Sequence, residues 1–205
     1  MKSRLTILSE SEIEDIHLCS IRILERVGFL VGSPRVVKLL VDAGATVDSG
    51  GKTVKIPSSL VEECLRKHPN SFTLNARSRE NDLMINPDRI YAHPCGGCLN
   101  ILDSDGGGVR VATTKDVEVL TKLIDASNNI HECDMLDYAG DAPQQVRDVH
   151  TVATMLRNTT KTCGVMAYND HNLEIILKLA AAVVGGEEEL RKRPIISFGA
   201  SPTSP

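Results

Sequence analysis

Apolar residues in the first part of the chain recur every three or four positions, a spacing that predicts amphipathic helices. Ser9 and Glu12 form the S-x-x-E pattern of a capping box, and Gly28 stands where helices commonly end, so residues 10–27 are predicted to form a helix. Short alternating stretches and two further helices follow. The remaining predicted elements are a strand at 29–31, a helix after Ser33 and Pro34, a hairpin at 46–56, a helix at 59–69, and strands at 71–75 and 83–85.

From about residue 89 onward, predicted strands and helices alternate. Thr113 with Asp116 caps one helix, and Pro143 begins another. This alternation is typical of a parallel sheet with helical connections, either a (β/α) barrel or an open doubly wound sheet, and periodicity does not distinguish the two. The predicted strands cover 90–93, 131–138, 162–167 and 195–199, and a hairpin at 99–111 turns on Gly106, Gly107 and Gly108.

The charge of the chain is nearly balanced. Lys and Arg number 23 and Asp and Glu number 27, giving a net charge of -4, and the basic residues are spread along the sequence, so no nucleic-acid surface is expected. The longest weakly polar run, residues 175–184, contains Lys178 and is too short to span a membrane. The N-terminus lacks the apolar core of a signal peptide, which predicts a cytoplasmic location and reduced thiols for the six cysteines.

Five blocks of sequence, in order along the chain, carry a family resemblance. They are LSESEIEDIHLCSIRILERVGFLV, LLVDAGATVD with VKIPSSLVEECLRKHPNSFTL, YAHPCGGCLNILDSDGGGVRVATTKDVEVLTKLIDASNNI, DVHTVATMLRNTTKTCGVMAY, and AAAVVGGEEELRKRPIISFGASPTSP. Together these blocks resemble the trimethylamine methyltransferase family of corrinoid-dependent enzymes, over essentially the whole chain.

The resemblance implies an α/β fold: an α+β N-terminal cap region over residues 1–88, then the first half of a TIM-type (β/α)8 barrel over residues 89–205, with about four parallel strands. A complete barrel needs eight strands and roughly 250 residues, so the chain is expected to be an N-terminal fragment. Half a barrel leaves open sheet edges, which favour pairing with another chain. A homo-oligomer is therefore expected.

The resemblance also implies an activity. The family moves a methyl group from a tertiary or quaternary amine, such as trimethylamine or a betaine, to a cobalt corrinoid. That corrinoid is carried on a separate partner protein, so this chain itself is expected to bind no cofactor and no metal. The trimethylamine branch carries pyrrolysine beyond the region covered here, so the sequence leaves the choice of amine open. The alternative function is a non-catalytic binding or assembly module made of a truncated barrel.

Candidate substrate-binding residues follow from barrel geometry, because barrel enzymes place function at the carboxyl ends of their strands. Aromatic faces attract quaternary ammonium groups, and an acidic side chain would balance their charge. The tyrosines could equally pack at the rim with wet hydroxyls, and nearby Asp141 suits a helix start. Ser201 could donate to the carboxylate of a betaine. The candidates are Tyr138, Tyr168, Asp137, His93, Gly96, Gly97 and Ser201.

The CGGC sequence at residues 95–98 has the spacing of half a zinc site. Such a site needs two more ligands, and His93, His131, Cys133 and Cys163 lie on neighbouring predicted strands. No second C-x-x-C exists, so the favoured interpretation is a tight glycine turn with the cysteines as small fillers. A zinc hydrolase remains the third function class. No glycine-rich fingerprint of a nucleotide fold follows a strand.

Overall fold

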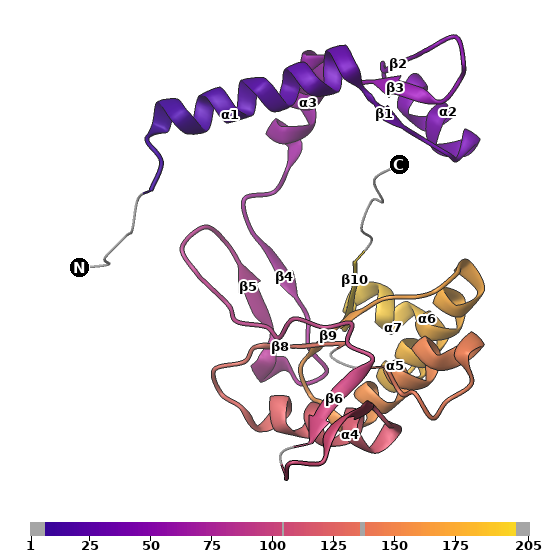
Figure 1. The fold of residues 1–205 in the computed structure, drawn as a ribbon. Coiled ribbons are helices and arrows are strands. Elements are labelled where there is room, and N and C mark those ends of the chain that lie inside the picture. Colours follow the sequence, from indigo (N-terminus) through magenta and orange to yellow (C-terminus); the bar gives the residue numbers. More distant parts are fainter. Residues whose placement is uncertain (1–6, 104, 136–137, 200–205) are drawn as a thin grey trace. The chain divides into compact units, whose positions relative to one another are not determined.

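The computed structural model describes residues 7–103, 105–135 and 138–199 (Figure 1). The chain forms two compact units that meet between Pro69 and Asn70. The segment 70–88 therefore belongs to the second unit by its contacts. The boundary near residue 88 between a cap and a barrel in the complete protein stays a prediction.

The first unit begins with helix α1 (Glu10–Arg22), which continues as a π-helical turn over Ile23–Val27. The predicted capping box is confirmed, since the Ser9 hydroxyl accepts from the Glu12 backbone N–H and the Glu12 carboxylate accepts from the Ser9 N–H. Gly28 ends the helix with φ 77°, and a Cβ there would lie 2.5 Å from the carbonyl oxygen of Val54. Both the backbone conformation and the space therefore require glycine at this position.

A small antiparallel sheet completes this unit, in the order β1-β3-β2. Val31, Ala45 and Val54 form its buried core, against which α2 packs Val37 and Leu40. The predicted hairpin and both predicted helices are confirmed. The elements are β1 (Phe29–Leu30), α2 (Pro34–Asp42), β2 (Thr46–Val47), β3 (Thr53–Lys55) and α3 (Ser58–Lys67).

The second unit is built around a parallel sheet in the order β10-β9-β8. Cys133 pairs with Cys163, and Cys163 pairs with Ile196, so the register runs straight across the sheet. Its strands are β8 (Glu132–Asp134), β9 (Thr162–Val165) and β10 (Ile196–Phe198). Two antiparallel hairpins lie outside it: β4 (Phe72–Leu74) with β5 (Leu83–Ile85), and β6 (Asn100–Asp103) with β7 (Gly108–Val111).

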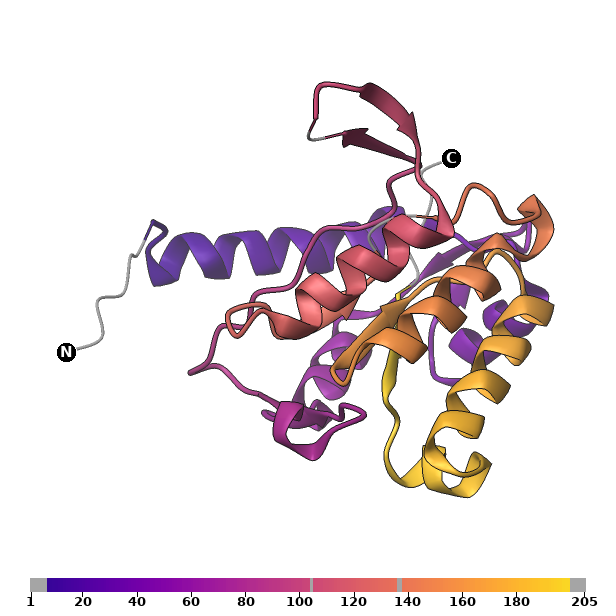
Figure 2. The same cartoon turned by 90° about the horizontal axis from the view of Figure 1, so that it is seen from below.

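Helices connect the parallel strands and cover one face of their sheet. Figure 2 shows α4, α5 and α6 side by side on this face. Cys133 and Cys163 point into the core that the helices form, together with Val152, Met155 and Ile176. The helices are α4 (Thr114–Ala126), α5 (Arg147–Asn158), α6 (Asp170–Val184) and α7 (Glu187–Lys192), with 3-10 turns at Arg79–Asn81 and Gln144–Val146.

The predicted first barrel strand at residues 90–93 is wrong. The segment still runs alongside β8 in the parallel direction, because His131 N–H donates to Ala92 O at 2.8 Å and Gly97 N–H donates to Met135 O at 2.9 Å. Two features interrupt a regular ladder between these bonds. The Ala92 N–H donates to the His131 side chain at Nδ1, and Pro94 has no N–H to donate.

The fold is thus mixed α/β with three parallel strands where about four were predicted. The described residues form no closed barrel. The strand predicted at 131–138 is shorter than expected and ends at Asp134. Among the helices of the described part of the chain, none is both long and apolar enough to cross a membrane.

Removal of the α4 cap should destabilise the second unit. Thr113 accepts from the Asp116 N–H and completes a capping box. We expect Thr113→Ala to lower the free energy of unfolding by about 1 kcal/mol, the usual cost of losing such a cap. Urea denaturation followed by circular dichroism measures it. Lys115→Ala, an exposed change in the same helical turn, is the control, and an equal loss in both variants would contradict the role of the cap.

Candidate functional site

A cavity of about 410 Å³ lies at the carboxyl ends of the parallel strands. It occupies the face of the sheet opposite the helices, because alternate residues of a strand point to opposite faces. His93 and Gly96, two of the residues predicted from the sequence, line it. Its other lining residues include Glu132, Asp134, Gly164, Met166 and Ser197.

Two carboxylates from β8 share this cavity. Glu132 and Asp134 are two residues apart and therefore lie on the same face of the strand, whereas Cys133 between them is buried beneath the helices. The Ser197 hydroxyl of β10 donates to Glu132 Oε1 at 3.0 Å. This hydrogen bond crosses the central strand β9, so the polar side chains of the two outer strands meet over its backbone.

His93 contributes the third polar side chain. Its Nδ1 lies 3.0 Å from the carbonyl oxygen of Pro94 and 3.4 Å from Asp134 Oδ2. Both neighbours are hydrogen-bond acceptors, so Nδ1 carries a proton. The backbone N–H of Met135 donates to the other oxygen, Asp134 Oδ1, at 2.9 Å. These two contacts orient the Asp134 carboxylate, and its side chain is 31% exposed to solvent.

The central strand carries a glycine at the level of these carboxylates. In the register of the sheet, Gly164 lies directly between Asp134 and Ser197. A Cβ at Gly164 would come within 2.6 Å of Asp134 Oδ1 and 3.4 Å of Glu132 Oε1. The absence of a side chain therefore lets both carboxylates extend over the middle of the sheet. Gly97, also predicted as a site residue, faces the same region, because its Cβ would lie 3.9 Å from Met166 Cε.

The two predicted tyrosines lie together, with the ring centroids of Tyr138 and Tyr168 5.7 Å apart and the planes 33° from parallel. Neither is among the residues that line the cavity. Burial raises the pKa of both hydroxyls, and at Tyr168 the positive charge of Arg147 offsets only part of this increase. Their role in substrate binding stays a prediction.

A buried carboxylate holds this tyrosine pair in place. Asp148 is fully buried on α5, and its Oδ2 accepts from the Tyr168 backbone N–H at 2.7 Å. Its Oδ1 accepts from Asn172 Nδ2 at 2.8 Å. Asp148 thus links β9, by way of the loop at Tyr168, to α5 and α6. The sequence analysis did not single out this residue, because nothing in the local pattern marks it as buried.

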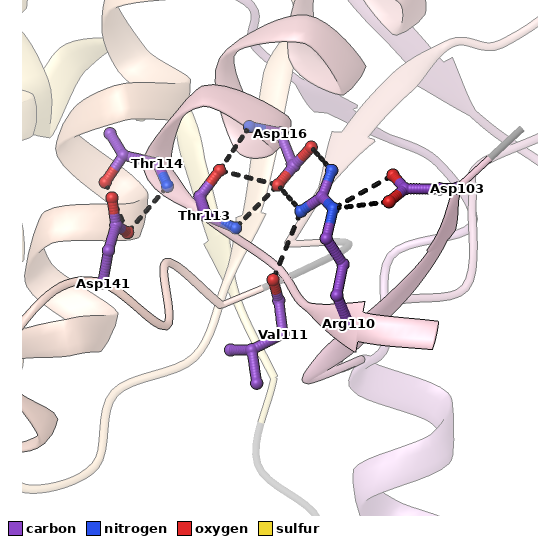
Figure 3. A network of polar contacts seen from close by, with 7 residues as sticks. All are labelled: Asp103, Arg110, Val111, Thr113, Thr114, Asp116 and Asp141. Atoms are coloured by element: carbon purple, nitrogen blue, oxygen red, sulfur yellow. Dashed lines mark hydrogen bonds and ion pairs between the residues drawn. The ribbon is translucent and has the colours of Figure 1, made fainter. Parts of the chain in front are cut away.

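Three further residues discussed as candidates follow β8 in the sequence, and the structure describes only one of them, Asp141. Asp137 and Ser201 lie outside the described residues, and their predicted roles stay predictions. Asp141 accepts hydrogen bonds from the Thr114 backbone N–H at 2.8 Å and from its hydroxyl at 2.9 Å (Figure 3). The interpretation of Asp141 as a residue at the start of the helix that follows Pro143 is wrong, because its carboxylate accepts at the start of α4 instead.

The same helix start carries an ionic network that fixes the hairpin β6–β7. Arg110 of β7 donates to both oxygens of Asp103 at 3.0 Å and to both oxygens of Asp116 at 2.7 and 2.8 Å (Figure 3). The Arg110 guanidinium, with the Thr113 hydroxyl and backbone N–H, holds the pKa of the Asp116 carboxyl well below its ordinary value. The hairpin is therefore attached to α4 directly after the segment that lines the cavity.

The cysteines of the CGGC sequence do not meet the other cysteines in a metal site. Cys95 and Cys98 are exposed, whereas Cys133 and Cys163 are buried on the helix-covered side of the sheet. Within the ranges that the structure describes, no three His, Cys, Asp or Glu side chains are grouped as metal ligands would be. Gly97 adopts a left-handed φ of 94°, which favours glycine, but residues 95–97 form no turn or bend, and the exposed Cys95 and Cys98 are not the small fillers that were predicted.

Sequence reasoning missed Glu132, Asp134, Gly164 and Ser197. A usable signal was present, because Glu-Cys-Asp at 132–134 alternates polar, small apolar and polar residues, as a strand with two different faces does. The predicted strand was too long, and it moved the expected carboxyl end from Asp134 to Asp137. Gly164 and Ser197 carry no local signal, since only the register of the sheet brings them beside β8.

The arrangement defines a class of protein: an α/β protein whose parallel strands end at a cavity lined by carboxylates. The family model described as "Trimethylamine methyltransferase (MTTB)" matches residues 2–205. The chain therefore belongs to the trimethylamine methyltransferase family, as the sequence blocks predicted.

The relatives are named for one of two substrates, trimethylamine or glycine betaine. The chain is 32% identical over 197 residues to trimethylamine methyltransferase MttB of Desulfitobacterium hafniense strain DSM 10664 / DCB-2, covering 96% of this chain and 40% of that protein. It is 29% identical over 191 residues to the glycine betaine methyltransferase of D. hafniense strain Y51, with 93% and 39% covered. To MttB of Methanosarcina barkeri it is 31% identical, with 98% and 42% covered. The chain thus spans about 40% of the length of these relatives.

The lowered pKa of Asp116 gives a testable dependence of stability on pH. Because the folded pKa is below the ordinary value of 3.8, the ion pair contributes its full stability above that value and loses it as the pH falls through the lowered pKa. We expect Asp116→Asn to be less stable than the wild type at neutral pH, with the difference shrinking below pH 3.8. Urea denaturation across pH 2–7 measures it.

The exposed change Asp15→Asn on α1 serves as the control for the loss of one carboxylate. A constant difference between wild type and Asp116→Asn across the whole range would mean that the carboxylate is not stabilised by its partners.

Proposed function

We propose that the complete protein moves a methyl group from a tertiary or quaternary amine to a cobalt corrinoid carried on a separate protein. The observation that carries this proposal is the family match over residues 2–205, together with relatives named for trimethylamine and for glycine betaine. The cavity supports it chemically, because it offers carboxylates to a substrate whose nitrogen is positively charged.

The residues of this chain would act by binding and orienting the substrate. Glu132 and Asp134 balance the charge of the ammonium group, and His93 and Ser197 hold these carboxylates in position. A quaternary nitrogen has no lone pair, so its departure after methyl transfer needs no general acid. The cavity fits a reaction without a general acid. Its polar side chains contact one another, and the rest of its wall includes the apolar residues Met166 and Phe198.

The methyl acceptor is a co-substrate and belongs to the partner protein. The corrinoid supplies the nucleophile when that protein is docked. The carboxyl-end face, where the cavity opens, is the face to which both the amine and the acceptor must come, as in other barrel enzymes. Self-association of the chain through the open sheet edges is a further part of the proposal.

Methyl transfer provides the direct test of the proposed activity. The intact protein is incubated with a reduced corrinoid protein and trimethylamine or glycine betaine, and methylation of the corrinoid is followed by its absorbance. We expect amine-dependent methylation. If neither amine methylates the acceptor while the protein remains folded, the non-catalytic binding or assembly module becomes the better account.

Removal of either cavity carboxylate should weaken the binding of a cationic substrate. We expect Glu132→Gln and Asp134→Asn each to raise the KM for the amine roughly tenfold, the equivalent of about 1.4 kcal/mol of lost attraction. Steady-state methyl transfer measures it. Glu188→Gln, an exposed change on α7, is the control that should leave KM unaltered. An unchanged KM in both cavity variants would remove these carboxylates from the site.

The tyrosine pair, which does not line the cavity, is the alternative place for the cation. Tyr168 is 46% exposed, and cation–π attraction at exposed sites is worth about 0.5–1 kcal/mol. If the cation binds at the tyrosine pair and not in the cavity, Tyr168→Leu weakens the binding of tetramethylammonium about two- to fivefold and Tyr168→Phe leaves it nearly as it is. Calorimetric titration distinguishes the two. Equal losses in both variants would assign the effect to the hydroxyl instead of the ring.

A further inference from the structure

We propose that Gly164 is the specificity-determining residue of the cavity: by omitting a side chain at the centre of the sheet, it lets Glu132 and Asp134 converge where the cationic end of the substrate binds. This inference rests on the proposed function for the identity of the substrate. On this inference, the missing side chain at Gly164 decides both the shape of the cavity and where its two negative charges lie.

The backbone of β9 does not itself require glycine at this position. The glycines of the described chain that adopt a left-handed φ are at other positions, and Gly164 is paired in the regular parallel ladder on both sides. A glycine inside a strand costs stability relative to alanine, by roughly 0.5–1 kcal/mol, and commonly marks a place where another group approaches closely. At Gly164 the approaching groups are side chains and not backbone.

Those side chains are the two acidic residues of the cavity. A Cβ at Gly164 would lie 2.6 Å from Asp134 Oδ1, 3.2 Å from Asp134 Cγ and 3.4 Å from Glu132 Oε1. The first of these distances is shorter than van der Waals contact permits, so an alanine would displace the Asp134 carboxylate. In its present position Asp134 Oδ1 accepts from the Met135 N–H, and its Oδ2 lies 3.4 Å from His93 Nδ1, so a displaced carboxylate would lose these contacts.

The glycine also opens the path between the outer strands. The Ser197 hydroxyl reaches Glu132 Oε1 at 3.0 Å across β9, and Gly164 pairs with Ser197 on one side and with Asp134 on the other. A Cβ at Gly164 would lie 3.4 Å from Glu132 Oε1, so this hydrogen bond passes close over the glycine. Gly164 thus permits a row of polar groups from all three strands to point into one cavity of about 410 Å³.

Two carboxylates placed close together repel each other, and a cation between them relieves that repulsion. The cation binds on the cavity side of these carboxylates, since their oxygens already fill the space directly over the glycine. A side chain at residue 164 would displace the Asp134 carboxylate and so weaken its attraction for the cation.

The test compares two glycines of the same cavity by calorimetric titration of the intact protein with tetramethylammonium. A Cβ at Gly199 would meet no atom within 4 Å, whereas one at Gly164 would collide with Asp134. We expect Gly164→Ala to weaken binding at least tenfold and Gly199→Ala to change it less than threefold. Equal affinities for Gly164→Ala and the wild type would overturn the inference.

A double-mutant cycle separates the specific role of Gly164 from a general packing defect. If Gly164 acts by making room for Asp134, then adding Gly164→Ala to Asp134→Ala should cause no further loss of binding, because the colliding carboxylate is already gone. Additive losses would assign Gly164 a merely structural role. Should Gly164→Ala alone fail to fold, the comparison of Asp134→Ala with the double variant still decides between the two.

Failure of this inference is distinguishable from failure of the proposed function. Tetramethylammonium binding that depends on Gly164, in a protein that does not methylate a corrinoid, would keep the inference and reject the activity. Methyl transfer that proceeds with unaltered KM in Gly164→Ala would keep the activity and reject the inference.

Discussion

The parallel pairing of β8, β9 and β10 is the constraint on which the rest of the second unit depends. Parallel strands need long crossover connections, and helices supply them. Those helices bury one face of the sheet, so the side chains on that face are apolar, as Cys133, Cys163 and Val165 are. The side chains on the other face do not pack against these helices. Glu132, Asp134 and Ser197 lie on that face and line the cavity.

The site is therefore a consequence of register more than of any single motif. A shift of β8 by one residue in its pairing with β9 would turn the two carboxylates into the helix core and Cys133 into the cavity. The hydrogen bond from Ser197 to Glu132 and the space above Gly164 depend on the same alignment. The network of Arg110 and Asp116 serves this arrangement indirectly, because it fixes the hairpin that follows the His93 segment.

Much of the fold was predictable from local signals. Capping boxes at Ser9 and Thr113 gave helix starts that the structure confirms, and the alternation of strands and helices gave the parallel sheet. The strand predicted at residues 90–93 is absent, because Pro94 and the His131 side chain interrupt its ladder although its composition suits a strand. Of the site, His93 and Gly96 were predicted from position in the chain. Gly164 and Ser197 were not, since only the pairing of distant segments brings them together.

The central claim is that a methylated ammonium group binds in the cavity against the carboxylates of β8. A crystal structure of the intact protein with tetramethylammonium tests it most directly. The account predicts the cation in the cavity, in contact with the carboxylates of Glu132 and Asp134. A cation seated on the Tyr138–Tyr168 pair, with the carboxylates turned away from it, would contradict the account.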